Sequence, residues 1–408
     1  MTLLVLNRRR IVDQILPWLA DVDPDVVLVT ARSVLPDAGS PGLRGYREVA
    51  AVADYDAPAV TDLVLELARR HRVDRILGTA EVDVLRAARV RETLGLPGQS
   101  VPSALAYRDK FRMKSLLAEA GLPVAAMRLV GSAAELRQAA REYGFPLVVK
   151  PAAGAGSVGV RVVPDAQVLE NLVATDPTRT GPLLAEEWVS GSLYHVDGIF
   201  AGGKVVQSWA SSMRYSNLDT VRACRPFISW MRPPGDPLGE RLRDLVATVV
   251  GVLPAPAEAT AFHAEVFHDP ADRLMLCEIA CRPGGGGIVP TYERALGVNL
   301  YAASLRGQAG RHPQVALDDP SLLAGFGWFP PRAGTLRELP RHCPVPGVYR
   351  YTPTGRVGHA YAAPGSISDT VAQALVAGDG LEDLDDRMAE LETWWQAACR
   401  WDPSSSTS

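Results

Sequence analysis

The sequence has little of what membrane-spanning, secreted or nucleic-acid-binding proteins require. Its longest apolar runs, 26–29 and 245–250, are far shorter than the roughly 20 residues of a membrane span. At the N-terminus the apolar residues precede the basic stretch 8–10, the reverse of their order in a secretory signal. The formal net charge is −4, so the basic excess typical of nucleic-acid binding is missing. We therefore expect a cytoplasmic protein without membrane or nucleic-acid partners.

Cysteine is scarce, and it is too scattered to indicate a disulfide framework or a zinc site. The five cysteines are an odd number, and only Cys277 and Cys281 lie close together. No second pair or histidine cluster completes a zinc site, so reduced thiols are expected. Glycine and proline are abundant, with 36 and 32 residues, and 47% of the 408 residues are hydrophobic. This composition indicates many turns and a core divided among about two to four domains.

The first hundred residues alternate strand-like and helix-like segments. Strand patterns at 3–6, 26–30 and 75–78 are separated by helical patterns such as 61–70. This alternation predicts a small parallel α/β domain. No glycine-rich phosphate turn follows the first strand, and we therefore interpret the domain as a scaffold and a substrate wall.

Two familiar phosphate-binding loops are also missing, although Gly154-x-Gly156-x-x-Gly159 has the glycine spacing of a dinucleotide-binding turn. That turn needs a helix after the glycines. Here residues 160–164 are β-branched and end in proline, which predicts a second strand. No Gly-Lys-Ser/Thr follows, which excludes a Walker A loop. The pattern predicts a hairpin flap whose backbone N–H groups approach phosphate oxygens, with Lys150 at the end of the strand that enters it.

Two glutamates stand inside apolar strand patterns. Glu265 lies in "FHAEVFH" and Glu278 in "LMLCEIACRPGGGG", and an ionised carboxylate in such a strand is costly unless it is paired. Neighbouring antiparallel strands can present both carboxylates to one cleft, where Mg²⁺ with nucleotide phosphates relieves their repulsion. Two separate salt bridges, for instance Glu278 with Arg282, remain the alternative. Arg282 is followed by a proline and four glycines. This pattern indicates a cation next to backbone N–H groups that can bind an anion.

Taken in order, these motifs resemble the ATP-grasp superfamily. Asp109-Lys110, Lys150 with its flap, the run 186–189, Glu265, and Glu278-x-x-x-Arg282 follow one another at spacings similar to those of its carboxylate–amine ligase branch, which includes the L-amino acid ligases. The resemblance covers roughly residues 1–310. The segment 79–98 is also similar to the end of the N-terminal domain in that group.

The resemblance implies an α/β fold. A small parallel α/β domain is followed by an ATP-grasp fold of α+β type, with ATP between two α+β subdomains. The expected boundaries are an N-terminal domain at 1–102, a small subdomain with the glycine flap at 103–186, a large subdomain with the metal site at 187–310, a C-terminal cap at 311–401 and a disordered tail at 402–408.

The resemblance also assigns the nucleotide site. Lys150 and Arg282 are the expected catalytic residues, and Glu265 and Glu278 are expected to hold one or two Mg²⁺, with Mn²⁺ as a substitute. An adenine hinge is expected at 186–189, and the flap closes over the phosphates. The expected ATP-binding residues are Lys110, Lys150, Gly154, Gly156, Ser157, Gly159, Glu186, Glu187, Trp188 and Val189.

Two positions depart from the family pattern. Leu193 stands where a glutamate often binds the ribose, and Ala280 stands where an asparagine often binds metal. Sugar contacts must then come from elsewhere, and the second metal ion would depend more on Glu278 or on water. Both departures leave room for weakened catalysis.

Activity follows from the resemblance as an expectation. It implies an ATP-dependent carbon–nitrogen ligase that joins a small carboxylate to an amine, such as two amino acids, through an acyl phosphate and releases ADP and phosphate. Secondary metabolism, including antibiotic formation, is an expected setting. The expected substrate residues are His195, Arg214, His263, Gly285 and Gly286.

Two other functions remain open. A carboxylating ATP-grasp enzyme would use bicarbonate, and a nucleotide-binding module without turnover would be consistent with Leu193 and Ala280. In the C-terminal helical pattern, the stripe Leu384, Met388, Leu391 and Trp395 indicates either core packing or a contact in a homodimer.

Overall fold

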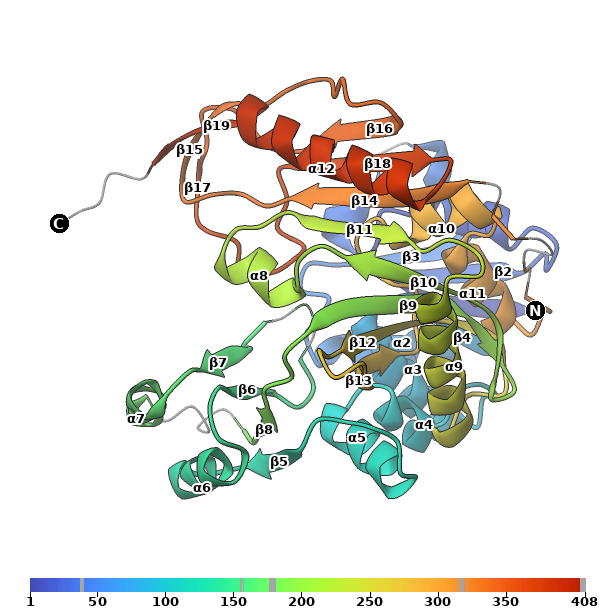
Figure 1. The fold of residues 1–408 in the computed structure, drawn as a ribbon. Coiled ribbons are helices and arrows are strands. Elements are labelled where there is room, and N and C mark those ends of the chain that lie inside the picture. Colours follow the sequence, from blue (N-terminus) through green and yellow to red (C-terminus); the bar gives the residue numbers. More distant parts are fainter. Residues whose placement is uncertain are drawn as a thin grey trace.

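The computed structural model describes residues 1–36, 40–154, 156, 158–175, 181–313, 315, 319–320 and 322–403 (Figure 1). Within these residues, no helix has the length and apolar character that crossing a bilayer requires. The predicted fold class is confirmed, because a parallel N-terminal sheet is followed by antiparallel sheets with helices packed on them.

The N-terminal unit is a four-stranded parallel sheet in the order β3-β2-β1-β4. Its strands are β1 (Thr2–Asn7), β2 (Asp25–Ala31), β3 (Tyr46–Val52) and β4 (Arg75–Gly78). Its helical segments are α1 (Val12–Trp18), η1 (Arg32–Val34), η2 (Pro41–Leu43), α2 (Ala59–Arg70) and α3 (Glu81–Leu94). Strands β1 and β2 consist mainly of leucine and valine, because helices bury both faces of such a sheet.

A second, antiparallel sheet has the order β5-β8-β6-β7. Two short helices, α4 (Val101–Ala106) and α5 (Lys110–Glu119), precede it. The sheet and its helices are β5 (Met127–Val130), α6 (Ala133–Tyr143), β6 (Leu147–Pro151), β7 (Arg161–Val163), α7 (Ala166–Ala174) and β8 (Leu183–Glu187). Strands β6 and β7 pair antiparallel around the glycines, so the predicted hairpin is confirmed. Figure 1 shows this unit projecting at the lower left.

The large sheet has eight antiparallel strands in the order β13-β12-β9-β10-β11-β14-β18-β16. Its first strands are β9 (Ser192–Ala201), β10 (Lys204–Met213), β11 (Phe227–Met231), β12 (Thr260–His268) and β13 (Leu274–Ala280). The helices between them are α8 (Asn217–Arg222) and α9 (Pro237–Val252). Hydrophobic clusters cover both faces of the sheet, which fixes the glutamate-bearing strands β12 and β13 at one edge.

The segment after the glycine run forms two helices, although its apolar pattern continues without a break. These are α10 (Ile288–Leu296) and α11 (Leu300–Gln308). Gly297 ends α10 in the left-handed conformation with φ 69°, a common glycine helix stop. The Asn299 side chain then caps α11 by accepting from the backbone N–H of Tyr301 and Ala302. The caps outweighed the continuous apolar pattern.

The C-terminal segment continues the large sheet. Strands β14 (Leu323–Phe329), β16 (Val348–Pro353) and β18 (Ala372–Gly378) belong to it, while β15 (Gly334–Glu338), β17 (Ala360–Tyr361) and β19 (Arg400–Pro403) form a separate sheet. Helix α12 (Leu381–Ala398) packs on β14 and β18, and its predicted apolar stripe is buried in the core. Of the predicted tail, residues 402–403 end β19 and residues 404–408 lie outside the described residues. The domain boundaries stay predictions.

Candidate active site

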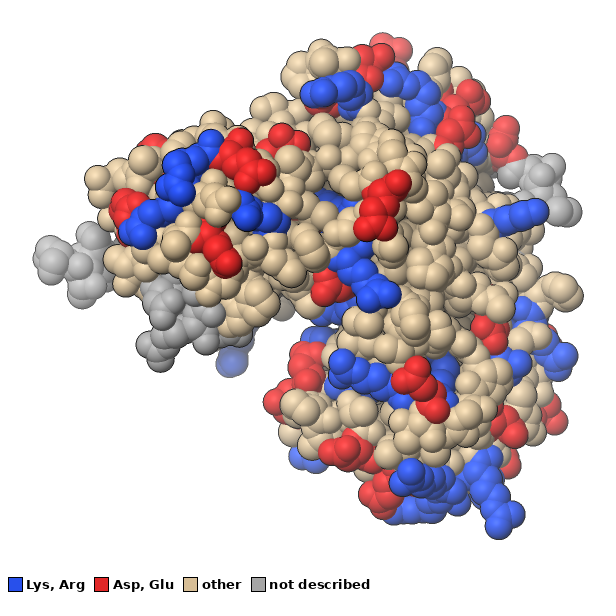
Figure 2. All heavy atoms as spheres, turned by 90° about the horizontal axis from the view of Figure 1, so that it is seen from below, with Lys and Arg blue, Asp and Glu red and all other residues tan. Residues whose placement is uncertain are grey.

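A cavity of about 520 Å³ lies between the N-terminal parallel sheet, the sheet β5-β8-β6-β7 and the large sheet. Its walls come from the loop after β1, the start of α3, the β6–β7 flap, the segment after β8, strands β12 and β13 and the glycine run after β13. In Figure 2 a notch separates two lobes of the molecule, and acidic and basic side chains are interspersed on the visible face. The residues that line the cavity include charges of both signs, and most of these form ion pairs.

A buried carboxylate holds two lysines at one end of the cavity. The two oxygens of Glu186 lie 2.8 Å from Lys114 Nζ and 2.8 Å from Lys150 Nζ. Burial alone raises the pKa of Glu186, but the two ammonium groups outweigh it and lower this pKa to about 2. The same pairing raises the pKa of Lys150 against the opposing effect of its burial. Lys150 is therefore a fixed cation facing the cavity.

The sequence prediction missed Lys114. It lies one helical turn after Lys110 on α5, so the i,i+4 spacing was the available signal. The adjoining positions Glu187, Trp188 and Val189 line the cavity, as an adenine hinge requires. Glu186 lines it as well, but its carboxylate is occupied by the lysines.

The two predicted metal ligands are direct cross-strand partners. Glu265 of β12 lies opposite Glu278 of β13, and both line the cavity. Glu278 Oε2 lies 2.5 Å from Lys110 Nζ. Burial raises the pKa of Glu278, but Lys110 and the other nearby cations outweigh it and lower the pKa to about 2. Adjacent carboxylates with hard oxygen donors suit Mg²⁺, so the residues present match the implied ion.

The alternative salt bridge of Glu278 with Arg282 is not formed. Arg282 Nε instead donates to Glu81 Oε2 at 2.7 Å, and its Nη1 donates to the carbonyl oxygen of Pro283 at 3.0 Å. Arg108 Nε lies 3.6 Å from the other oxygen of Glu81. The sequence prediction missed Glu81. It is the first residue of α3, so through it the N-terminal domain contributes a side chain to the site. Its only signal was an acidic residue in a first helical turn.

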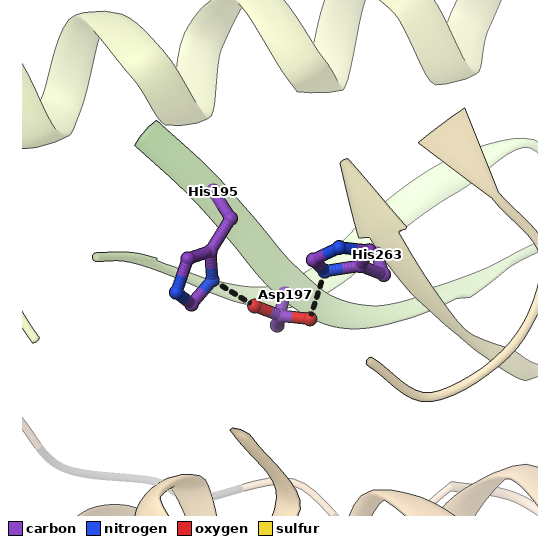
Figure 3. A group of neighbouring side chains, drawn as sticks. All are labelled: His195, Asp197 and His263. Atoms are coloured by element: carbon purple, nitrogen blue, oxygen red, sulfur yellow. Dashed lines mark hydrogen bonds and ion pairs between the residues drawn. The ribbon is translucent and has the colours of Figure 1, made fainter. Parts of the chain in front are cut away.

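Two buried histidines share one aspartate (Figure 3). Asp197 accepts from His195 Nδ1 at 2.5 Å and from His263 Nδ1 at 2.8 Å. His195 Nε2 lies 2.6 Å from Ser229 Oγ, and His263 Nε2 lies 3.5 Å from Glu265 Oε1. One possible ligand atom from each of His195, Asp197 and His263 lies within 4.8 Å of the other two. This spacing is also compatible with binding of a metal ion. The hydrogen bonds orient His263 toward Glu265 and the cavity.

The charge of this cluster follows from its contacts. Burial opposes ionisation of Asp197, but its two histidine partners lower its pKa below the ordinary range. Burial lowers the pKa of His263, but Asp197 outweighs that effect and raises it to about 10. His263 is therefore a cation at neutral pH, and its other neighbour Glu265 also accepts from Asn217 Nδ2 at 2.6 Å.

The predicted substrate residues divide into two groups. His263, Gly285 and Gly286 line the cavity. His195 and Arg214 are not among its lining residues, and their role in substrate binding stays a prediction. His195 is turned toward Ser229, and Arg214 is drawn to α12, where it pairs with Asp385 at 2.9 Å and Glu392 at 3.6 Å.

The flap residues have mixed outcomes. Gly154 and Gly156 line the cavity, whereas Gly159 is not among its lining residues and Ser157 lies outside the described residues. The carbonyl oxygen of Gly154 accepts from Lys110 Nζ at 2.8 Å. A Cβ at Gly156 would lie 3.3 Å from Ser366 Oγ, so the C-terminal segment reaches the flap. Ser366, Ile367 and Ser368 also line the cavity, and nothing in their local sequence indicated it.

Comparisons with known proteins agree with this geometry. Residues 109–189 match the family described as carbamoyl-phosphate synthase L chain, ATP binding domain. The L-arginine-specific L-amino acid ligase of Bacillus subtilis is 25% identical over 293 residues, which are 70% of this chain and 69% of that protein.

Solved structures share the fold over nearly the whole chain. An L-amino acid ligase from Bacillus licheniformis has a TM-score of 0.76 at 16% identity, covering 99% of both chains. The biotin carboxylase domain dimer of the Hydrogenobacter thermophilus 2-oxoglutarate carboxylase, solved with MgADP, ADP and bicarbonate, has a TM-score of 0.69 at 17% identity, covering 98% of this chain and 90% of that one.

Proposed function

Because the chain belongs to the ATP-grasp superfamily, in its carboxylate–amine ligase branch, we propose that it joins a small carboxylate to an amine and forms an amide. The carrying observation is one cavity in which two facing glutamates meet Lys110, Lys150 and Arg282. Two amino acids are the proposed substrates, with a dipeptide or a related amide as the product. Its use in antibiotic formation stays a prediction.

The cations answer the main electrostatic obstacle of this reaction. A substrate carboxylate oxygen attacks the γ-phosphorus of ATP, the bond to the β-phosphate oxygen breaks, and an acyl phosphate and ADP form. Lys110, Lys150 and Arg282 offset the charge of the two approaching anions. Bound Mg²⁺ would add Lewis-acid stabilisation of the phosphate oxygens, with Glu265 and Glu278 as its proposed ligands. One ion or two, and a substitution by Mn²⁺, stay open predictions.

Amide formation then needs an amine and a dry site. The neutral amine attacks the acyl carbon, the carbon–oxygen bond to phosphate breaks, and the amine nitrogen loses a proton. The flap glycines and the position of Ser366 next to Gly156 support a closure that keeps water from the acyl phosphate. No enzyme nucleophile is required, which agrees with the raised pKa, about 12, that burial imposes on the cavity residue Cys277.

The direct test measures phosphate release from ATP and Mg²⁺ with pools of amino acids and amines, and it weighs the products by mass spectrometry. We expect release that requires both substrates and a product mass equal to the pair minus water. Glu278→Gln should lower kcat by about 100-fold or more, since it removes a proposed metal ligand. Glu142→Gln, an exposed change on α6, is the matched control. Turnover by Glu278→Gln at the wild-type rate would contradict the assignment.

A second candidate is carboxylation with bicarbonate. The biotin carboxylase domain, a structural neighbour with bicarbonate bound, supports it at the level of fold. Release stimulated by bicarbonate without any amine would favour this reaction. Tight ATP binding without turnover across the substrate pools would favour a nucleotide-binding module, to which Leu193 and Ala280 lend support.

A further inference from the structure

Among the residues that the structure describes, one cation in the cavity has no partner. The other cations that line it each face a carboxylate: Arg8 faces Asp56, Lys110 faces Glu278, Lys150 faces Glu186, Arg282 faces Glu81 and His263 faces Asp197. Arg9 also lines the cavity, but its side chain has no ion pair or hydrogen bond with the residues that the structure describes. Its Nε is buried without an acceptor, a state that costs free energy unless a ligand supplies one.

The backbone of Arg9 is nevertheless held firmly. Asn7, fully buried at the end of β1, donates from Nδ2 to the Arg9 carbonyl oxygen at 2.8 Å and accepts from the Arg9 N–H at 2.9 Å. The same side chain contacts Thr30 Oγ1 at 3.3 Å and accepts from Thr79 Oγ1 at 3.3 Å. The loop is thus tied to the ends of β2 and β4. A fixed backbone with a free guanidinium is a preorganised binding group.

The position in the sheet points the same way. In the order β3-β2-β1-β4, the chain leaves β1 toward β2 on one side and later returns to β4 on the other side. Ligands of parallel α/β sheets bind outside the carboxyl ends of the strands at such a switch point. Arg9 follows β1 there, and Glu81, which holds Arg282, follows β4.

We propose that Arg9 binds the carboxylate of the amine-donating substrate, which is therefore an amino acid and not a simple amine. This inference rests on the proposed ligase reaction. The substrate that is phosphorylated consumes its carboxylate, whereas an amino acid that supplies the amine keeps its own. A guanidinium offers the two parallel N–H groups, Nε and one Nη, that a carboxylate accepts as a fork. Arg9 is then a specificity-determining residue.

Hydroxylamine separates the two halves of the reaction because it traps the acyl phosphate but has no carboxylate. Standard L-amino acids are first screened singly for hydroxamate formation and then in pairs for dipeptide formation. We expect Arg9→Gln to keep the kcat and KM of hydroxamate formation within about twofold, while the KM for the amine-donating amino acid rises about ten- to hundredfold. Arg9→Lys should restore part of the loss. Arg10→Gln, exposed and absent from the cavity lining, should match the wild type.

The outcomes separate the two proposals. If the wild type makes neither hydroxamate nor dipeptide, the ligase proposal fails. If the wild type makes both and Arg9→Gln lowers both equally, or lowers neither, only the role of Arg9 is overturned. Should Arg9→Gln not fold, the wild type itself decides. The best amine-donating amino acid is compared with its carboxamide at equal concentrations of unprotonated amine, and equal KM values would overturn the proposal.

Discussion

Glu186 shows how a single buried residue prepares the cavity for an anion. Its carboxylate balances Lys114 and Lys150, so neither lysine stands as an uncompensated charge in the folded protein. Lys150 is 7% exposed and Lys114 is fully buried, which leaves Lys150 as the one of this pair that lines the cavity. A fixed ammonium loses little freedom when a phosphate arrives. The residue predicted for the adenine hinge thus holds Lys150, which is proposed to contact phosphate.

Removing this carboxylate should destabilise the fold. Glu186→Gln leaves two buried ammonium groups with a neutral partner, and we expect a loss of about 3–5 kcal/mol in the free energy of unfolding at pH 7. Urea denaturation of the variant and the wild type measures it. Glu187→Gln changes the next residue, whose Oε1 accepts from the Ala126 N–H, and should cost no more than about 1 kcal/mol. Equal losses in both variants would contradict the central role of Glu186.

The same pair predicts a pH dependence with a definite sign. The pKa of Glu186 falls from 4.5 to about 2 on folding, so its stabilisation is fully present above pH 4.5 and is lost as the pH falls toward 2. Across that window the difference between the wild type and Glu186→Gln should shrink by on the order of 3 kcal/mol. Denaturation series between pH 7 and pH 2 follow this change. A difference that grows in acid would refute the assignment.

At the scale of elements, the glycine run after β13 packs against the histidine cluster. A Cβ at Gly284 would lie 2.6 Å from Asp197 Oδ1, whereas a Cβ at Gly285 would meet nothing within 4 Å. Gly286 adopts φ 66°, and a Cβ there would come within 3.1 Å of Phe326. The run is therefore both a close-packed turn and a wall of the cavity, and its members have different reasons to be glycine.

Alanine substitutions should separate these reasons. Gly284→Ala should lower the melting temperature by several degrees, corresponding to about 1–3 kcal/mol, because Asp197 must move. Gly285→Ala should melt like the wild type but raise the KM of a substrate, because its methyl group enters the cavity wall. Differential scanning calorimetry and steady-state kinetics measure the two effects. If Gly284→Ala melts like the wild type, the packing argument fails.

The elements were predictable from sequence where the signal was local. Alternating apolar residues gave the strands around Glu265 and Glu278, and the proline after the flap gave the hairpin instead of a strand–helix turn. The break between α10 and α11 is harder to predict, because two local caps interrupt an apolar pattern that continues past them. Local periodicity therefore identified element types better than element ends.

Partners that come from distant segments were not predictable in the same way. Lys114 meets Glu186, Glu81 meets Arg282 and Asp197 meets His263 across more than sixty residues of chain, and no spacing in the sequence encodes these three pairs. Arg214 shows the converse case. The sequence predicted a substrate contact for this arginine, whereas its side chain forms an ion pair with α12. Motif order was sufficient for the family and for the charged core of the site. The pairs that hold those charges required the fold.

At the scale of the whole molecule, the N-terminal domain is joined to the charged core by a few polar contacts. Glu81 accepts a hydrogen bond from Arg282 and lies near Arg108. Gln308 of α11 donates to the Gly78 carbonyl oxygen at 3.1 Å and accepts from the Gly78 N–H at 2.9 Å. These contacts hold the carboxyl end of β4 against α11 and against Arg282 after β13, so the parallel domain contributes directly to the position of a proposed catalytic arginine.

Cutting the central contact should reduce catalysis more than stability. Glu81→Gln keeps the shape of the side chain but removes the charge that holds Arg282 Nε at 2.7 Å. We expect kcat to fall about 10- to 100-fold because a displaced cation no longer meets the developing phosphate charge. The melting temperature should change little, since Glu81 borders the open cavity. Glu92→Gln, an exposed change of equal charge on the same helix, controls for net charge. A fall in kcat shared by Glu92→Gln would mean that overall charge, and not the seating of Arg282 by the N-terminal domain, sets the rate.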